Sequence, residues 1–136
     1  GRRLPPLDIF LRDRTAHAIG VCVLDDDQKS VNAVILDKGC LIPSDHTKPF
    51  QLSKPGQTSC LIQLLQGADG AYAEDCEELG RFELDNLKPI HHEPHRVEIR
   101  IRIDDSGRLM AEAVDPHSGV RKDLEVPYQS AGKKAA

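Results

Sequence analysis

The sequence predicts a single all-β domain, built as an antiparallel sandwich or barrel. Apolar and polar residues alternate over short segments such as 79–84 and 97–103, which is typical of strands with one solvated face. Turn signals at 104–107 and 115–119 separate the later segments, and this spacing is typical of antiparallel β-domains. No helical periodicity extends beyond a turn or two. The 136 residues are enough for one domain with its own core.

The composition indicates an ordinary soluble protein with no affinity for nucleic acid or membranes. The net charge of −4 and the few aromatic residues, three Phe and two Tyr, provide neither a basic nor a stacking surface. We find no apolar run of membrane-spanning length and no secretory leader. The cysteines lack metal-ligand or redox spacing, which favours buried thiols in a reducing, cytoplasmic compartment; they are Cys22, Cys40, Cys60 and Cys76.

Two strands are predicted in the first 40 residues. Residues 18–24 place Ile19, Val21 and Val23 on one face, and 31–36 form a second apolar run. Three consecutive aspartates lie between these strands. They lack the alternating ligands and the turn glycine of a calcium loop, so we expect a solvated loop.

Turn residues interrupt the segment that follows. A turn at 38–39 leads to Pro43, which should end any ladder at that point. Residues 50–52 should form a short extended piece, and Pro55-Gly56 is a favoured turn pair.

Residues 59–66 are predicted to form the central strand. Both faces of this run are mostly apolar: Cys60, Ile62 and Leu64 share one, and Leu61, Gln63 and Leu65 share the other. A short apolar run of this kind, ended by a glycine, is typical of a strand that is covered on both faces.

The second half of the chain alternates strands with turns. The polar residues 71–78 should form a short helical turn or a loop. Further strands are expected at 79–84, 97–103, 109–114 and 121–126. The small residues of 129–136 indicate a disordered tail.

No catalytic motif is present. The chain contains no Gly-rich phosphate loop, nucleophile elbow or zinc-protease helix. Asp104 and Asp105 could be read as an acid–base pair, but they occupy a predicted hairpin turn, where aspartate is favoured for backbone reasons. From the residues alone we predict an all-β binding module with neither catalytic nor metal-binding residues.

A histidine-rich connection offers the one alternative based on metal chemistry. His91, His92 and His95 could supply ligands to zinc. Pro94 prevents a regular spacing and no fourth ligand is evident, so a solvated loop is the favoured interpretation.

Several motifs occur in an order that points to a known family. An acidic–apolar segment at 8–13 precedes the first strand, and Leu41-Ile42-Pro43 is followed seven residues later by Phe50. Leu79-Gly80-Arg81-Phe82-Glu83-Leu84 and then the hairpins at 104–109 and 113–119 complete the series. From residue 8 to about 128, this order resembles the β-sandwich substrate-binding domain of the DnaK-type seventy-kilodalton heat-shock chaperones.

The resemblance implies a division of the chain. Residues 1–14 would be a lead-in and interdomain linker, 15–128 the peptide-binding sandwich without its lid helices, and 129–136 the tail. Within the linker, the acidic–apolar residues would be Asp8, Ile9, Phe10, Leu11 and Asp13. A separate ATPase domain, which would carry ATP and magnesium, would control binding, and a J-domain co-chaperone is an expected partner. This fragment would therefore be no enzyme and would hold no cofactor.

The resemblance also implies a groove for unfolded or extended polypeptides. Its walls would be Ile19, Val21, Phe50, Cys60 and Ile62. Leu24 and Ser53 would form the two halves of an arch over the peptide, while Leu61 and Leu65 would hold the sandwich core. Without the resemblance, all five wall residues would be read as plain core.

Three departures from the family pattern leave an alternative open. Residues 25–28 resemble an insertion in the loop that carries one half of the arch, and Cys60 replaces a valine-like residue. Arg12 and His17 stand where the family prefers leucine. The alternative is a structural or interaction sandwich that has lost peptide binding and recognises one specific protein partner.

Overall fold

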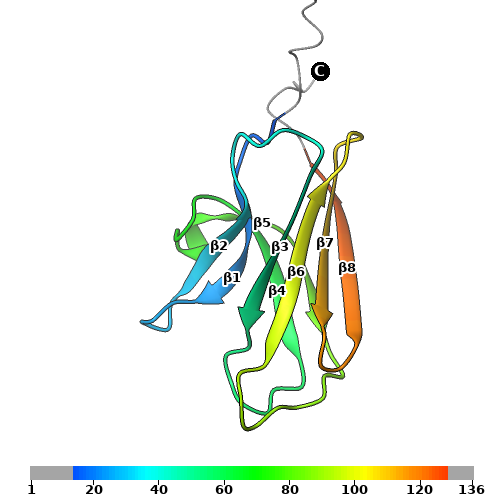
Figure 1. Ribbon diagram of the computed structural model, residues 1–136. Coiled ribbons are helices and arrows are strands. Elements are labelled where there is room, and N and C mark those ends of the chain that lie inside the picture. Colours follow the sequence, from blue (N-terminus) through cyan, green and yellow to red (C-terminus); the bar gives the residue numbers. More distant parts are fainter. Residues whose placement is uncertain (1–13, 129–136) are drawn as a thin grey trace, which may run out of the picture.

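A computed structural model describes residues 14–128, which form two four-stranded antiparallel sheets packed face to face (Figure 1). The first sheet has the order β2-β1-β4-β5 and the second β3-β6-β7-β8. Two separate sheets confirm the all-β prediction and decide for the sandwich over the barrel. The strands are β1 (Ile19–Leu24), β2 (Ser30–Leu36), β3 (Ser44–Gln51), β4 (Cys60–Gln66), β5 (Glu77–Leu84), β6 (Arg96–Ile103), β7 (Arg108–Asp115) and β8 (Val120–Pro127). The predicted linker at 8–13 and the tail at 129–136 lie outside the described residues.

Alternating apolar residues of both sheets build the core. In β6, Val97, Ile99, Ile101 and Ile103 are all buried, whereas the intervening residues are polar and mostly exposed. The facing sheet supplies residues of the same kind, among them Ile19, Val21, Leu36, Ile62, Leu64, Phe82 and Leu84. In these strands the hydrophobic alternation therefore sets which face points inward.

The third strand is longer than the sequence predicted. Only 50–52 were expected to be extended, yet β3 begins directly after Pro43 and pairs with β6 from Ser44 to Gln51. The strand lies at a sheet edge and most of its residues are exposed, so no apolar alternation marks it. Pro49 is tolerated there because an edge strand needs partners on one side only.

The predicted central strand is an interior strand but is not covered throughout. Leu61 is 52% exposed, so the expectation that it belongs to the core is wrong. Its cross-strand neighbour Glu83 is exposed as well, so this part of the outer face meets solvent. Further along, a register shift between Leu64 and Leu65 allows both of these consecutive residues to be buried.

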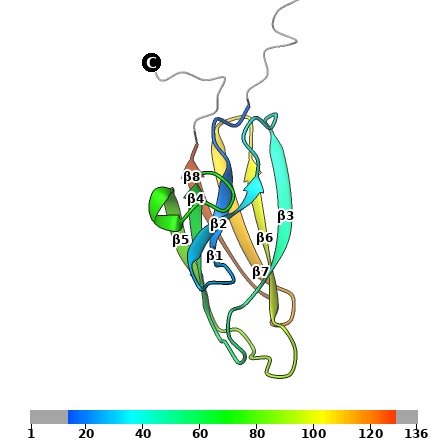
Figure 2. The ribbon, with the colours of Figure 1, turned by 90° about the vertical axis from the view of Figure 1, so that its left-hand side faces the viewer.

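The free side of β2 is closed by the segment that follows β4. The Asp69 carboxylate accepts a hydrogen bond from the Val34 amide at 2.9 Å, and the Ala71 carbonyl accepts one from the Asn32 amide at 2.8 Å. This segment continues into the short 3-10 helix η2 (Ala73–Asp75), the turn expected within 71–78. Figure 2 shows η2 beside the first sheet, on the opposite side of the molecule from β3.

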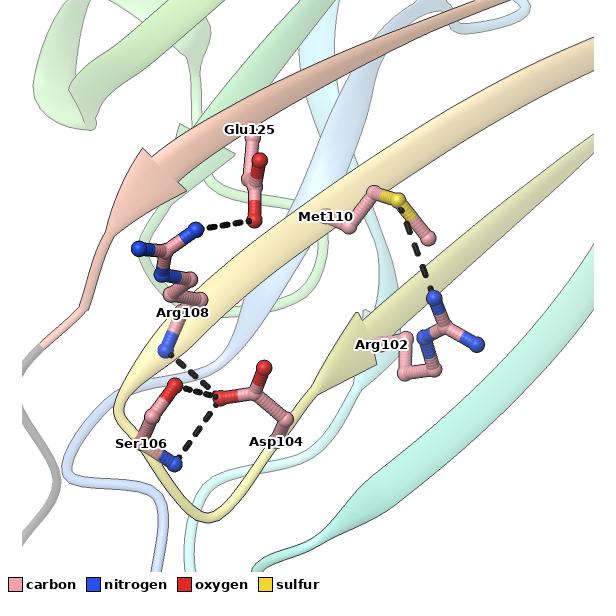
Figure 3. Close-up of polar contacts among 6 residues, drawn as sticks. All are labelled: Arg102, Asp104, Ser106, Arg108, Met110 and Glu125. Atoms are coloured by element: carbon pink, nitrogen blue, oxygen red, sulfur yellow. Dashed lines mark hydrogen bonds and ion pairs between the residues drawn. The ribbon is translucent and has the colours of Figure 1, made fainter.

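The hairpin between β6 and β7 is held by Asp104, as Figure 3 shows. One carboxylate oxygen of Asp104 accepts hydrogen bonds from the amides of Ser106 and Arg108 and from the Ser106 hydroxyl, at 2.6–3.1 Å. The Ser106 hydroxyl and these amides hold the pKa of Asp104 below its ordinary value. The side chain therefore stabilises a turn, in agreement with the backbone role predicted for it.

Residues 14–128 contain no helix with the length and apolar character needed to cross a bilayer.

Candidate binding groove

Strands β1 and β4 are paired over only part of their length. The ladder joins Ile19–Gln66, Gly20–Leu65 and Val21–Leu64. Beyond Val21, β1 continues to Leu24 paired only with β2, and residues 60–63 of β4 are paired only with β5. Within the described chain no ladder joins 22–24 to 60–63, so each strand turns an unpaired backbone edge toward the gap. In Figure 1 the β1–β2 hairpin points away from β4 at this end.

A pocket of about 690 Å³ occupies this fork. One wall comes from β1 and its turn into β2, and another from the end of β3 and the loop after it. The start of β4 and two residues of β6 complete the floor. The apolar lining consists of Val21, Cys22, Val23, Leu24, Phe50, Leu52, Cys60, Leu61, Ile62, Val97 and Ile99.

Six of the seven predicted groove residues line this pocket. Val21 and Ile62 are almost fully buried, so they belong to the floor and to the top of the core at once. Phe50 and Cys60 are half-buried, while Leu24 and Ser53 are exposed on the rim. These six positions, dispersed over more than 40 residues of sequence, come together at one end of the sandwich.

Ile19 is the predicted residue that does not line the pocket. It is fully buried in the sandwich core. Its register explains this, because it pairs with Leu36 on one side and with Gln66 on the other, in the closed part of the sheet. The alternation that puts Ile19 on the same face as Val21 was correct, but the strands open only beyond Val21.

Other lining residues were missed by the sequence analysis. Val97 and Ile99 alternate as core residues do, and only the packing of the two sheets brings them beneath the fork. Leu52 follows β3 in a segment with little periodicity. Leu61 was expected to point into the core, whereas it is exposed beside the pocket.

The Cys60 thiol behaves as an apolar group. Burial, together with the charges of Asp115 and Glu83, raises the pKa of Cys60 to about 11. A thiol with so high a pKa is protonated at neutral pH, and a protonated cysteine packs as a small hydrophobic side chain. The position can therefore contact an apolar group in place of a valine.

The loop at 25–28 is a hydrogen-bonded turn that forms part of the rim. One Asp25 carboxylate oxygen accepts hydrogen bonds from the amides of Asp27 and Lys29, both at 2.9 Å. The backbone is closed by a 2.9 Å bond from the Asp25 amide to the Lys29 carbonyl. Asp25 and Asp26 are the charged residues that line the pocket within the described chain. The Asp25 carboxylate thus supports the turn, which explains the aspartate without a calcium ion.

The histidine-rich connection divides into exposed and buried parts. His91 and His92 are exposed, but His95 is only 3% exposed. The prediction of a solvated loop is therefore wrong at His95. His95 Nε2 lies 2.9 Å from Asp115 Oδ2. Among residues 14–128, no three His, Cys, Asp or Glu side chains are grouped so that they could hold a metal ion.

Asp115 is the ionised partner in this buried pair. Burial alone would raise the pKa of its carboxyl, but hydrogen bonds from Ser118 and His95 outweigh burial and lower it. The amide of His117 donates a further bond to Oδ1 at 3.0 Å. The carboxylate is therefore compensated by several donors, as a buried charge requires.

Comparisons with known proteins agree on one family. The family model described as Hsp70 protein matches residues 5–136. The chain is 31% identical over 119 residues to the heat shock 70 kDa protein 6, chloroplastic, of Arabidopsis thaliana, covering 88% of this chain and 16% of that protein. It is 32% identical over 119 residues to the chaperone protein dnaK of Cyanophora paradoxa, covering 88% and 18%. It is 33% identical over 92 residues to a chaperone protein HscA homolog of Polynucleobacter asymbioticus, covering 68% and 15%.

Proposed function

Because this chain belongs to the Hsp70 protein family, we propose that residues 15–128 form a peptide-binding chaperone domain for extended, apolar segments of unfolded polypeptides. The membership itself supports a chaperone role in general. The main support for peptide binding is the fork between β1 and β4, where two unpaired strand edges border an apolar pocket.

An extended peptide suits this arrangement for two physical reasons. Its amides and carbonyls can pair with the unpaired edges at 22–24 and 60–63, and such main-chain bonds depend little on sequence. In an extended chain alternate side chains point in opposite directions, so one side chain can enter the pocket while its neighbours face solvent.

The lining residues take distinct roles in this proposal. Val21, Phe50, Cys60 and Ile62 form the pocket for an aliphatic side chain, because each combines an apolar surface with partial or full burial. Leu24 and Ser53, exposed on opposite rims, form the two halves of an arch over the peptide. Ile19 supports the floor from within the core.

The whole protein would regulate this groove from outside the described residues. The chain spans 15–18% of the length of the relatives named above. We expect an ATPase domain that carries ATP and magnesium, joined through the acidic–apolar segment at 8–13, and a J-domain co-chaperone as partner. The four cysteines are free thiols, which favours a reducing compartment such as the cytoplasm.

Titration of a fluorescently labelled, leucine-centred extended peptide tests the proposal. We expect saturable binding by the wild type and loss of binding in Cys60→Trp, because the larger side chain fills the pocket. Leu41→Trp is the matched control, since Leu41 is 40% exposed and does not line the pocket. The absence of saturable binding by the wild type would reject peptide binding in favour of a sandwich that recognises one specific protein partner.

A further inference from the structure

A buried histidine–aspartate pair lies behind one wall of the groove. The side chains of His95 and Asp115 are 1% and 0% exposed, and their nearest side-chain atoms are 2.9 Å apart. The other ring nitrogen of His95, Nδ1, is buried and has no hydrogen-bond partner among the described residues. Burying this pair is costly, and apolar residues of similar size usually give equal or greater stability. A buried pair of this kind therefore points to a role beyond packing.

Backbone hydrogen bonds join the loop that contains His95 to residues 52–58, which form one wall of the groove. The amide of Leu52, which lines the pocket, donates a 2.8 Å hydrogen bond to the His95 carbonyl. Two similar bonds follow along the same two loops, from Gly56 N to Ile90 O at 2.8 Å and from Leu87 N to Thr58 O at 2.9 Å. Figures 1 and 2 both show the loop after β3 and the loop before β6 side by side at one end of the sandwich.

The two loops also meet where the His91 side chain lies beside Gly56. The Gly56 φ of +71° is a conformation that glycine adopts readily, and a Cβ atom there would lie 2.5 Å from His91 Cε1. The His91 ring therefore lies against Gly56, and the positive φ is what favours glycine at this position. Elsewhere a space of about 250 Å³ remains between residues 51–55 and 91–95, so the wall is held by a few contacts and not by continuous packing.

The Asp115 side of the pair belongs to the second sheet. Asp115 is the last residue of β7, and its carbonyl accepts a 2.8 Å bond from Gly119 in the turn to β8. Ser118 in the same turn bonds to the Asp115 side chain and accepts a 2.6 Å bond from the amide of Lys88. The loop at 85–95 is thus tied to this turn at two places, through His95 and through Lys88.

We propose that the His95–Asp115 pair is a positioning element of the groove, which holds the loop at 85–95 against β7 so that this loop holds the 52–58 wall over a bound peptide. The inference rests on the proposed function. Because the pair holds a wall and contacts no peptide, its loss is expected to shorten the residence of a peptide more than it slows its entry.

The test compares three variants by peptide dissociation and by amide hydrogen exchange. His95→Leu removes the bond to Asp115, His95→Gln retains an N–H donor at a similar distance along the side chain, and His92→Leu is a matched control in an exposed neighbour. We expect His95→Leu to raise the peptide dissociation rate by about tenfold. His95→Gln should bring this rate most of the way back to the wild-type value, and His92→Leu should have the wild-type rate. Exchange at Leu52, Gly56 and Leu87 should increase in His95→Leu while the amides of β6 and β7 stay protected.

The exchange readout separates this inference from the function it rests on. If the wild type binds no peptide, the proposed function fails, while faster exchange confined to Leu52, Gly56 and Leu87 would still support the positioning role. Unchanged dissociation and unchanged Leu52 exchange in His95→Leu would overturn the inference, as would a loss of protection spread evenly over both sheets. If His95→Leu does not fold, Ser118→Ala serves as the substitute variant, because it removes the hydroxyl that bonds to Asp115 and Lys88. Amide exchange at Leu87 and Leu52 should then be faster than in the wild type. Exchange at the wild-type rate at both residues would overturn the inference.

Discussion

Val21 of β1 and Leu64 of β4 form the last cross-strand pair before these two strands separate. Each strand retains its other partner, so the sheet forks without losing its outer ladders. Two outer edges differ from the fork: residues 69–71 form hydrogen bonds along β2, and Lys48 of the edge strand β3 donates a 2.7 Å bond to the Val34 carbonyl. Exposed strand edges attract other chains, so proteins usually protect them. The open edges at the fork are therefore where the proposed function places an extended peptide.

The Cys60 thiol should react slowly at neutral pH despite lining the pocket. With a pKa of about 11, only about one molecule in a thousand carries the thiolate at pH 8. In a variant whose other three cysteines are serine, the alkylation rate by iodoacetamide should rise about tenfold per pH unit between pH 7 and 10. Saturating peptide should suppress the reaction.

The same variant unfolded in urea provides the control for this measurement. Its thiol should titrate near the ordinary value of 9.0, because burial and the fixed neighbouring charges are lost. A folded-state rate that levels off by pH 9 would show that Cys60 is more solvated than the groove requires. Equal rates with and without bound peptide would place the thiol outside the occupied site.

Asp115→Asn should destabilise the fold in a pH-dependent way. The native pKa of Asp115 lies below its ordinary value of 3.8, so its ionised form stabilises the fold above that pH and the stabilisation is lost as the pH falls through the native pKa. Near neutrality, chemical denaturation should show a loss of about 3–5 kcal/mol, since the change breaks a buried pair. Below about pH 4 the difference from the wild type should shrink.

Asp123→Asn on the exposed face of β8 is the control for the Asp115 variant. It should change the free energy of unfolding by less than about 0.5 kcal/mol. A difference between wild type and Asp115→Asn that stays constant from pH 3 to pH 7 would contradict the ionised, hydrogen-bonded state assigned to Asp115.

Tyr128→Phe should weaken the end of the sandwich opposite the groove. The Tyr128 hydroxyl donates a bond to the His17 carbonyl at 3.2 Å and lies 3.3 Å from the His17 amide, which donates to it. Its removal should cost about 0.5–1.5 kcal/mol in thermal or chemical unfolding, whereas Tyr72→Phe should be near neutral because Tyr72 is 49% exposed. Equal effects of the two changes would show that the hydroxyl bonds do not contribute. Peptide affinity should be unchanged in both variants.

Much of the fold could be predicted because alternation reports which face of a strand is apolar. It located β6 and β7 to within a residue or two and put Val21 and Ile62 on inward faces. It could not find the polar edge strand β3, whose residues make backbone bonds without burying side chains. Nor could it distinguish Leu61, on the solvated side of the sheet, from a core residue.

The candidate site depended on relations between distant residues. The resemblance to a family supplied six residues that line the pocket, but the separation of β1 from β4 beyond Val21 left Ile19 in the core. The His95–Asp115 pair joins residues 20 positions apart, and local composition suggested solvent for His95. Only the packing of the loop against β7 reveals that the imidazole is buried.

Amide hydrogen exchange at the fork, measured with and without a saturating leucine-centred peptide, tests the central claim most directly. If the peptide pairs with the open edges, at least one amide within 22–24 and one within 60–63 should become strongly protected, while the amides of Val21 and Leu64 in the closed ladder change little. Peptide that binds without protecting either segment would contradict strand-edge recognition at the fork.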